Sequence, residues 1–258
     1  MPSSHPILAN LRACVRPLLV DSGVPAAPVG IWGSCLLANY QGLPFVVTAA
    51  HLVRSNHSGE VRILASDRAM KRLPLSQGIG VFADRPEEEV DALVYPATLA
   101  DLSRRDVKNS RLVRLEDSGA TQWERSAPVA QFVVVGYPRV LSLVDYDAGK
   151  VIANQVLLLG TYVSPVDGVA HMHTLRVDNP LELSEFAGFS GGAVFLIHQR
   201  LAADPICQFC GMAVQGTVTS GLVHFLDLHC LLHLVNEAKA HTRRFGTRLP
   251  ERIKKFKG

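Results

Sequence analysis

The chain has 258 residues, of which 48% are hydrophobic and 19% are charged, and its mean hydropathy is +0.17. This composition is typical of a globular protein with a large core, and it excludes a disordered or low-complexity chain. The 26 basic and 23 acidic residues leave a formal net charge of +3. That charge is too small to indicate a nucleic-acid partner for the chain as a whole.

The cysteines and the apolar segments indicate the cellular compartment of the protein. The five cysteines are an odd number without paired spacing, so the sequence does not predict a disulfide framework. The apolar stretch 7–20 is interrupted by Arg12, Arg16 and Pro17, and no secretion signal is recognisable. No apolar run reaches the roughly 18 residues that span a bilayer. We therefore expect a cytoplasmic protein without membrane association.

Hydrophobic periodicity divides most of the chain into four segments. Apolar residues at helical spacing between residues 6 and 20 predict a helical extension over 1–28. Short β-branched and apolar runs separated by turn signals then predict about a dozen strands, in a first β unit over 29–100 and a second over 129–226, and their spacing favours a closed barrel or a sandwich over a parallel sheet. The polar stretch 101–128 is expected to link the two units as an inter-barrel linker.

Two segments are expected after the last strand. Asp227 can cap a helix over 227–242 that has one apolar face. Residues 243–258 form a basic tail with seven basic residues and one glutamate, a net charge of +6, so the rest of the chain carries −3. Such a run is usually a solvated face. The tail is the one segment through which nucleic acid or an acidic partner could bind, and nucleic acid is otherwise not expected.

Three short motifs contain the residue types of nucleophilic catalysis. They are T-A-A-H at 48–51, V-D-A-L at 90–93 and G-F-S-G-G at 188–192. A serine hydroxyl needs an imidazole that removes its proton, and the imidazole needs a carboxylate that fixes its tautomer. We therefore predict His51, Asp91 and Ser190 as catalytic residues. The backbone amides of Gly188 and Ser190 can point to one position and are predicted to form an oxyanion hole.

Other aspartates could take the place of Asp91 in this arrangement. Asp84, Asp101 and Asp106 lie nearby in the sequence. Asp91 is favoured over them because it alone opens an apolar strand.

The order of the motifs, and the separations of 40 and 99 residues between the predicted catalytic positions, resemble the chymotrypsin-like (trypsin-fold) serine proteases. Within this family the chain resembles the bacterial trypsin-like and HtrA-type enzymes, and we expect a protease domain without a PDZ domain. Gly33-Ser34, V-V-G-Y-P at 134–138 and G-M-A-V-Q-G at 211–216 extend the resemblance over residues 29–242.

The resemblance implies an all-β fold of two six-stranded antiparallel β-barrels, here flanked by an N-terminal and a C-terminal helix. The active-site cleft would lie between the barrels. Ser190 would attack the scissile carbonyl, His51 would act as general base and then as general acid, and Asp91 would orient His51. The protein substrate would be cleaved as by a serine endopeptidase.

Three positions depart from the pattern of the family. Phe189 stands where the digestive enzymes have an aspartate that pairs with a new N-terminus, so packing or a partner is expected to set the conformation of this loop. Leu52 stands where secreted members have a cysteine, which leaves Cys35 without that disulfide. Val214 stands where many members have a serine that supports the catalytic aspartate.

The resemblance also implies a substrate-binding region. Ser184 would lie at the floor of the primary pocket, with Gly216 and Gly221 as open walls, and the strand with Val214 and Gln215 would border the substrate. Since no aspartate lies at the floor, a small or apolar residue is favoured before the scissile bond. A shift of one residue would bring in Glu185 and favour a basic residue instead.

No metal site and no cofactor are expected. Cys207 and Cys210 lack a second pair, and they are interpreted as two residues flanking a hairpin strand. His229 and His233 lie one helical turn apart without an evident third ligand. The motif H-M-H at 171–173 is interpreted as the exposed face of an edge strand.

Two functions from different classes remain after the sequence analysis. The first is a serine endopeptidase that cleaves specific intracellular proteins and is regulated by a partner, which would order the loops around Phe189 or 145–154. The second is a protease-fold binding or adaptor module with little or no turnover.

Overall fold

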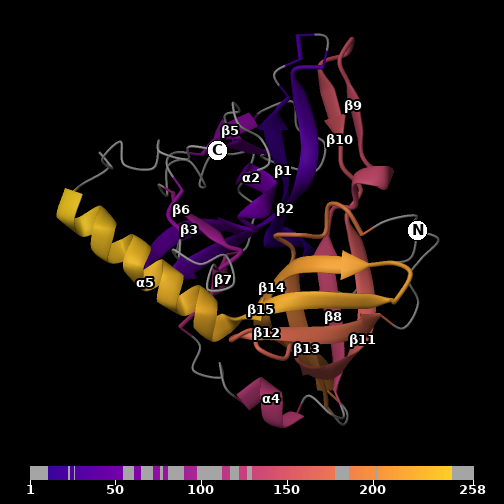
Figure 1. Ribbon diagram of the computed structural model, residues 1–258, viewed down its shortest axis with the longest axis vertical. Helices are drawn as coiled ribbons and strands as arrows, with labels where there is room; N and C mark the ends of the chain where they lie inside the picture. The colour runs from indigo at the N-terminus through magenta and orange to yellow at the C-terminus, as the bar shows by residue number, and fades with distance from the viewer. Residues whose placement is uncertain are drawn as a thin grey trace.

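The computed structural model describes most of the chain except its ends and several connections. The described residues are 11–22, 24–25, 27–54, 61–64, 72–75, 78–80, 90–97, 112–116, 122–126, 130–177, 186–200 and 203–245. They form two β units that lie one above the other, with a long helix at the side (Figure 1). This mostly β architecture is the predicted fold class.

The first half of the chain forms a seven-stranded sheet. Its strands are β1 (Val15–Asp21), β2 (Val29–Tyr40), β3 (Leu43–Thr48), β4 (Val61–Leu64), β5 (Arg72–Pro74), β6 (Leu93–Pro96) and β7 (Val113–Arg114). The strand order is β5-β4-β1-β2-β3-β6, with β7 beside β2. All these pairs are antiparallel except β7 with β2, so this unit differs from the expected six antiparallel strands.

The second half forms a closed antiparallel barrel of six strands, as predicted. They are β8 (Gln131–Gly136), β11 (Val156–Pro165), β12 (Met172–Val177), β13 (Ala193–Arg200), β14 (Ala203–Thr217) and β15 (Leu222–Asp227). The order is β11-β12-β15-β14-β13-β8, and the pairing of β8 with β11 closes the barrel. Strands β9 (Leu143–Asp145) and β10 (Lys150–Ile152) form a separate hairpin.

The prediction of an N-terminal helix through residue 20 is wrong. Only residues 11–13 lie in a helical turn, and residues 15–21 form β1, which pairs with both β2 and β4. Six of the seven residues of β1 are buried. Residues 18–20 of β1 are apolar and buried, and periodicity alone cannot distinguish a short apolar run of this kind from a segment of a helix. Residues 1–10 lie outside the described part of the chain.

The predicted linker contacts both units. Within 101–128, β7 joins the first sheet, and the short helix α4 (Gln122–Ser126) places Trp123 in the core of the second barrel. Trp123 is fully buried and packs edge-on against Phe132. The described parts of this linker are therefore structural components of both halves, and its other residues lie outside the described part.

The predicted C-terminal helix is present as α5 (Leu228–Phe245). Its N-terminus is capped by Asp227, whose Oδ1 accepts a hydrogen bond of 2.8 Å from the backbone N of Cys230. The helix leaves the second barrel and packs against β6 of the first sheet (Figure 1). Among the described helices, none is long and apolar enough to cross a membrane. Residues 246–258 of the basic tail lie outside the described part.

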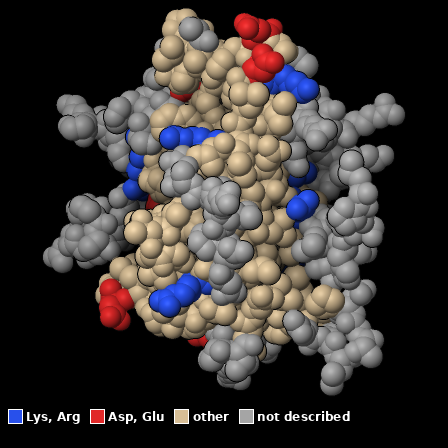
Figure 2. All heavy atoms as spheres, turned by 90° about the vertical axis from the view of Figure 1, so that its right-hand side faces the viewer, with Lys and Arg blue, Asp and Glu red and all other residues tan. Residues whose placement is uncertain are grey.

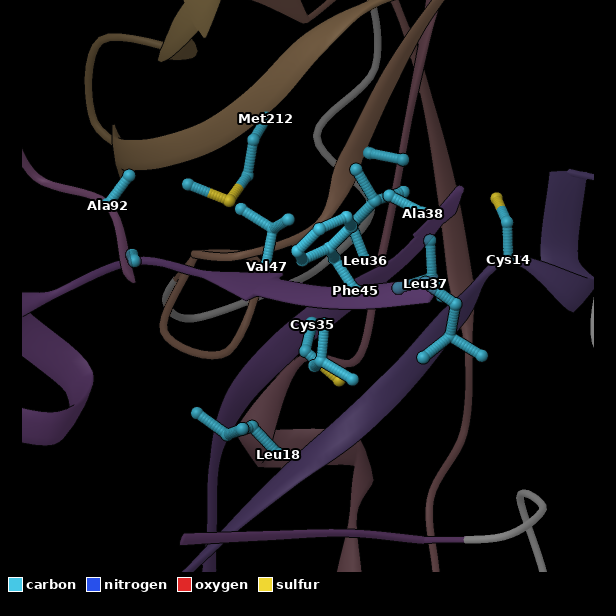
Figure 3. Close-up of a cluster of buried hydrophobic side chains, with 14 of the residues drawn as sticks. Cys14, Leu18, Cys35, Leu36, Leu37, Ala38, Phe45, Val47, Ala92 and Met212 are labelled. Carbon is cyan, nitrogen blue, oxygen red and sulfur yellow. The ribbon is translucent and has the colours of Figure 1, made fainter. Parts of the chain in front are cut away.

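A continuous core joins the two halves. Met212 of β14 points toward Phe45 and Val47 of β3, and these residues belong to one buried cluster (Figure 3). A second cluster fills the closed barrel. On the face shown in Figure 2, the described charged side chains are scattered and form no patch of one sign. The shared core fixes the position of the first sheet relative to the barrel.

Two further segments contribute to the surroundings of the predicted site. They are the single-turn helix α2 (His51–Arg54), which follows β3, and the 3-10 helix η3 (Arg139–Leu141), which follows β8.

Candidate active site

His51 and Asp91 meet at one end of a strand pair. His51 lies just after β3 and Asp91 just before β6, and these strands pair with Thr48 opposite Leu93. The Nδ1 of His51 donates a hydrogen bond of 2.7 Å to Oδ2 of Asp91, and the backbone N of His51 donates one of 2.8 Å to Oδ1. The carboxylate thus holds the proton on Nδ1 and leaves Nε2 as a base.

Ser190 lies on a tight loop of residues 186–192 that precedes β13, called the Ser190 loop below. Gly188 and Gly191 have φ values of +100° and +84°, which side-chain-bearing residues rarely adopt. A Cβ at Gly191 would lie 1.9 Å from the carbonyl O of Ser34, and one at Gly188 would lie 2.2 Å from that of Tyr137. The glycines of the motif are therefore required by backbone conformation and by close approach.

The predicted catalytic residues line one cleft of about 710 Å³. His51 and Asp91 come from the first sheet and Ser190 from the loop before β13. Ser190 Oγ donates a hydrogen bond of 2.8 Å to the carbonyl O of Val214. The side chain of His51 is 49% exposed, so a substrate can reach this group from solvent.

The backbone amides of Gly188 and Ser190 are the ones predicted to form an oxyanion hole. Within the described ranges, no backbone carbonyl accepts a hydrogen bond from the amide of Gly188 or Ser190. The carbonyl O of Gly188 accepts a hydrogen bond of 2.6 Å from Oγ of Ser34. Amides without a described backbone acceptor are the kind of donors that an oxyanion hole would use.

Ser34 connects three parts of the site, and the sequence analysis did not assign it this role. Its Oγ also accepts a hydrogen bond of 2.9 Å from the backbone N of Tyr137, and its own N donates one of 2.9 Å to the carbonyl O of Ser190. Ser34 is fully buried. The dipeptide Gly33-Ser34 contributes to the family resemblance, and this was the available signal for Ser34.

The position of Phe189 is set by apolar packing. Phe189 is 3% exposed, and its ring lies 6.0 Å from that of Phe186 at an interplanar angle of 80°. A Cβ at Gly136 would lie 2.7 Å from the ring of Phe189. Packing against β8 and Phe186 thus replaces the charge pair that the resemblance implies for this position.

A small pocket adjoins Ser190, and side chains of the protein occupy most of its space. Its volume is about 10 Å³, which is room for about one water molecule. Phe186 forms its wall, since a Cβ at Gly216 would lie 2.8 Å from the Phe186 ring. The pocket in this conformation therefore has no room for a large side chain of a substrate.

The structure brings together only some of the predicted substrate-binding residues. Val214, Gln215 and Gly216 line the cleft. Gly221 lies in the turn after β14 and is not among the described residues that line it, and Ser184 lies outside the described part of the chain, as does Glu185. The cleft also contains five residues that the sequence analysis did not propose: Phe186, Ala187, Thr217, Val218 and Thr219. The last three directly follow Gly216, and this adjacency was the available signal.

No protein-family model matches the sequence, and no curated protein shows a significant match. Solved structures do match. The HtrA-type protease AlgW with tripeptide matches with a TM-score of 0.54 and 13% identity, over 93% of this chain and 64% of that chain. The Drosophila Grass clip serine protease of the Toll pathway matches with a TM-score of 0.60 and 12% identity, over 90% of this chain and 70% of that chain. The scabies mite inactivated protease paralogue S-I1 matches with a TM-score of 0.53 and 14% identity, over 90% of this chain and 96% of that chain. The chain therefore has the chymotrypsin-like fold of trypsin-fold serine proteases, and it spans less than two thirds of the AlgW chain.

Proposed function

We propose that this protein is a serine endopeptidase that hydrolyses peptide bonds of protein substrates. The observation that carries the proposal is the pairing of His51 Nδ1 with Asp91 Oδ2 at 2.7 Å in the same cleft as Ser190. Fold alone does not suffice, because one of the similar structures is described as an inactivated protease. The residues in this chain are those that the reaction requires.

The reaction would begin with rotation of the Ser190 side chain away from the carbonyl O of Val214 toward His51. Nε2 of His51 takes the proton of Ser190 Oγ while Oγ attacks the scissile carbonyl carbon. The amides of Gly188 and Ser190 stabilise the oxyanion, and His51 then protonates the leaving amine. Water attacks the acyl-enzyme with the same base, which releases the acid and restores Ser190. Asp91 stabilises the protonated His51 throughout.

Labelling with a fluorophosphonate probe tests this assignment. After prolonged incubation we expect stoichiometric labelling of the wild type and none in Ser190→Ala or His51→Ala. Asp91→Asn should lower peptidase turnover about ten-thousand-fold, because the amide no longer holds the proton of the His51 imidazole on Nδ1. Ser164→Ala, an exposed serine on β11, is the matched control and should label as the wild type does.

The same experiment distinguishes the peptidase from the second function class, a protease-fold binding module. A protease-fold binding module would show no labelling under any condition while retaining its ligand. Labelling that survives in Ser190→Ala would contradict the assignment of the nucleophile.

We further propose that the targets are intracellular proteins and that a partner protein regulates cleavage. All five cysteines are free, as a reducing compartment requires. The segment η3–β10 carries exposed apolar side chains, Val140, Leu141, Leu143 and Tyr146. It contacts the Ser190 loop, because the backbone N of Arg139 donates to the carbonyl O of Ala187 at 2.8 Å. A protein bound there could change the conformation of the loop.

The regulation has its own test. We expect the purified protein alone to react slowly with the probe and to cleave unrelated protein substrates poorly. Rapid labelling and rapid cleavage of generic substrates by the isolated protein would contradict regulation by a partner, and they would leave the proposed peptidase activity intact.

A further inference from the structure

A second group of ionisable side chains lies away from the active site, at one end of the closed barrel. It contains Glu124 of α4, His173 of β12 and Asp227 at the end of β15, and one ligand atom from each lies within 4.8 Å of the others. His173 is 7% exposed and Asp227 is 3% exposed, whereas Glu124 faces solvent. Figure 1 shows α4 beneath the barrel and the start of α5 beside β12.

The separation of the two buried groups fits two ligands of one ion. Nε2 of His173 lies 3.5 Å from Oδ2 of Asp227, which is longer than an ordinary N–H···O hydrogen bond. Two ligands of a tetrahedral zinc ion, each bonded at 2.0–2.1 Å, are about 3.3–3.4 Å apart. An ion between them therefore needs only a small adjustment of either side chain.

The outer atoms of both side chains are already held. Nδ1 of His173 lies 3.0 Å from the hydroxyl O of Tyr162, and Oδ1 of Asp227 accepts a hydrogen bond from the backbone N of Cys230. When Nδ1–H donates to Tyr162, the lone pair of Nε2 points inward. A ligating histidine in proteins characteristically donates its other N–H in this way.

The surroundings favour a cation. Trp123 forms an apolar wall, with its ring centroid 4.9 Å from that of His173, which lowers the local dielectric constant. Among the described residues, the basic side chains close to Oδ2 of Asp227 are His171 at 3.1 Å and His173 at 3.5 Å. His171 contacts Oδ2 at 3.1 Å from the solvent side and holds the carboxylate in place. Two carboxylates therefore face one another without a described lysine or arginine paired to Asp227.

We propose that this group binds one zinc ion through His173 Nε2, Asp227 Oδ2 and the carboxylate of Glu124, with water as the fourth ligand. A nitrogen donor together with carboxylates suits zinc, whereas calcium and magnesium prefer oxygen ligands alone. The ion would fasten α4, and with it the connection between the two halves, to β12 and the first turn of α5. This role does not depend on the proposed peptidase activity.

The test is a zinc titration of the full chain after treatment with a chelator, followed by calorimetry. We expect one zinc ion per chain, and visible d–d absorption of a tetrahedral site when cobalt replaces zinc. Asp227→Asn removes the carboxylate but keeps a good helix cap. Glu124→Gln changes an exposed side chain. Both variants and His173→Ala should weaken binding at least about tenfold.

Two matched variants show that the ion is bound at this group. His233→Ala changes an exposed histidine of α5, and His51→Ala removes the imidazole of the candidate active site. Both should bind zinc as the wild type does. The proposal is overturned if zinc does not bind, or if binding is unchanged in Asp227→Asn and Glu124→Gln. Thermal melting of Glu124→Gln without metal shows whether the variant is folded.

Discussion

Phe186 limits the space beside Ser190, where we expect the side chain of a substrate to lie. Its ring packs against Gly216 and Phe189, and the remaining pocket of about 10 Å³ is bordered by Ala213 and Val223. A large side chain before the scissile bond would have to displace a buried ring from a close-packed site. The wild type is therefore expected to prefer alanine, glycine or serine at this position of the substrate.

Phe186→Ala should widen the preference to large apolar residues, because it removes the ring from the pocket. Cleavage of a peptide library that varies only the residue before the scissile bond measures this change. Phe195→Ala, which removes another buried ring, from β13, is the control for general destabilisation and should keep the wild-type preference. A wild type that prefers large residues would contradict the role of Phe186.

We expect Ser34 to be a positioning residue that acts through the Ser190 loop. In Ser34→Ala the backbone N of Tyr137 and the carbonyl O of Gly188 would lose their buried partner, at a cost of about 1–3 kcal/mol for each unpaired group. We expect kcat and the rate of fluorophosphonate labelling to fall while KM changes little, because the oxyanion hole forms less often.

Steady-state kinetics and urea unfolding of the same variant separate the two effects. Ser142→Ala, which loses a single hydrogen bond to Pro138, is the matched control. Equal losses of stability in both variants with unchanged kcat in Ser34→Ala would show that Ser34 is merely structural.

At the scale of elements, β1 shows how an apolar segment can be assigned to the wrong secondary structure. Leu18 and Leu19 are fully buried in the core, and β1 lies between β2 and β4 in the sheet. Their neighbours in the sequence are apolar too, so the segment lacks the polar alternation that would have indicated a strand. Long-range pairing, which the local pattern does not encode, decided the assignment.

Leu18→Ala should lower the free energy of unfolding by about 2–5 kcal/mol, since it removes a buried side chain from the core. Val24→Ala, at a side chain that is 52% exposed, should change it by less than about 0.5 kcal/mol. Urea unfolding followed by fluorescence measures both. A near-neutral Leu18→Ala would be expected for a detached surface helix and would contradict the packing of β1.

At the scale of the whole molecule, burial protects most of the thiols. Burial raises the pKa of Cys14 and Cys35 to about 12, and burial together with the charge of Asp227 raises that of Cys230 to about 12. Burial also raises the pKa of Cys210 and, to a smaller extent, that of the half-buried Cys207. The thiolate is the reactive form, so these groups react slowly at neutral pH.

Alkylation by iodoacetamide at pH 8 should therefore modify Cys207 alone in the folded protein, more slowly than a free thiol. Raising the pH toward 9 should accelerate this reaction because the thiolate fraction rises, while the other four react only after unfolding. Mass spectrometry with and without urea measures the sites, and Cys207→Ser is the control. Rapid native modification of Cys14 or Cys35 would contradict the described core.

Local motifs supplied the residues proposed for the candidate active site, and they said little about what surrounds them. His51, Asp91 and Ser190 stand in short patterns whose order is informative. Phe186 is an ordinary apolar residue in the sequence, and its effect on the pocket arises from its packing on Gly216.

The sequence by itself determined the mostly β fold, the closed second barrel, the helix capped by Asp227 and the candidate catalytic residues. These follow from local chemistry: turn residues, apolar runs, a capping carboxylate and glycines that a tight loop requires. Only the tertiary structure decided that residues 15–21 form a strand, that Ser34 holds the Ser190 loop, and that Glu124 meets His173 and Asp227. The physical reason is that these contacts join residues far apart in the chain, and closing the sheets brings them together.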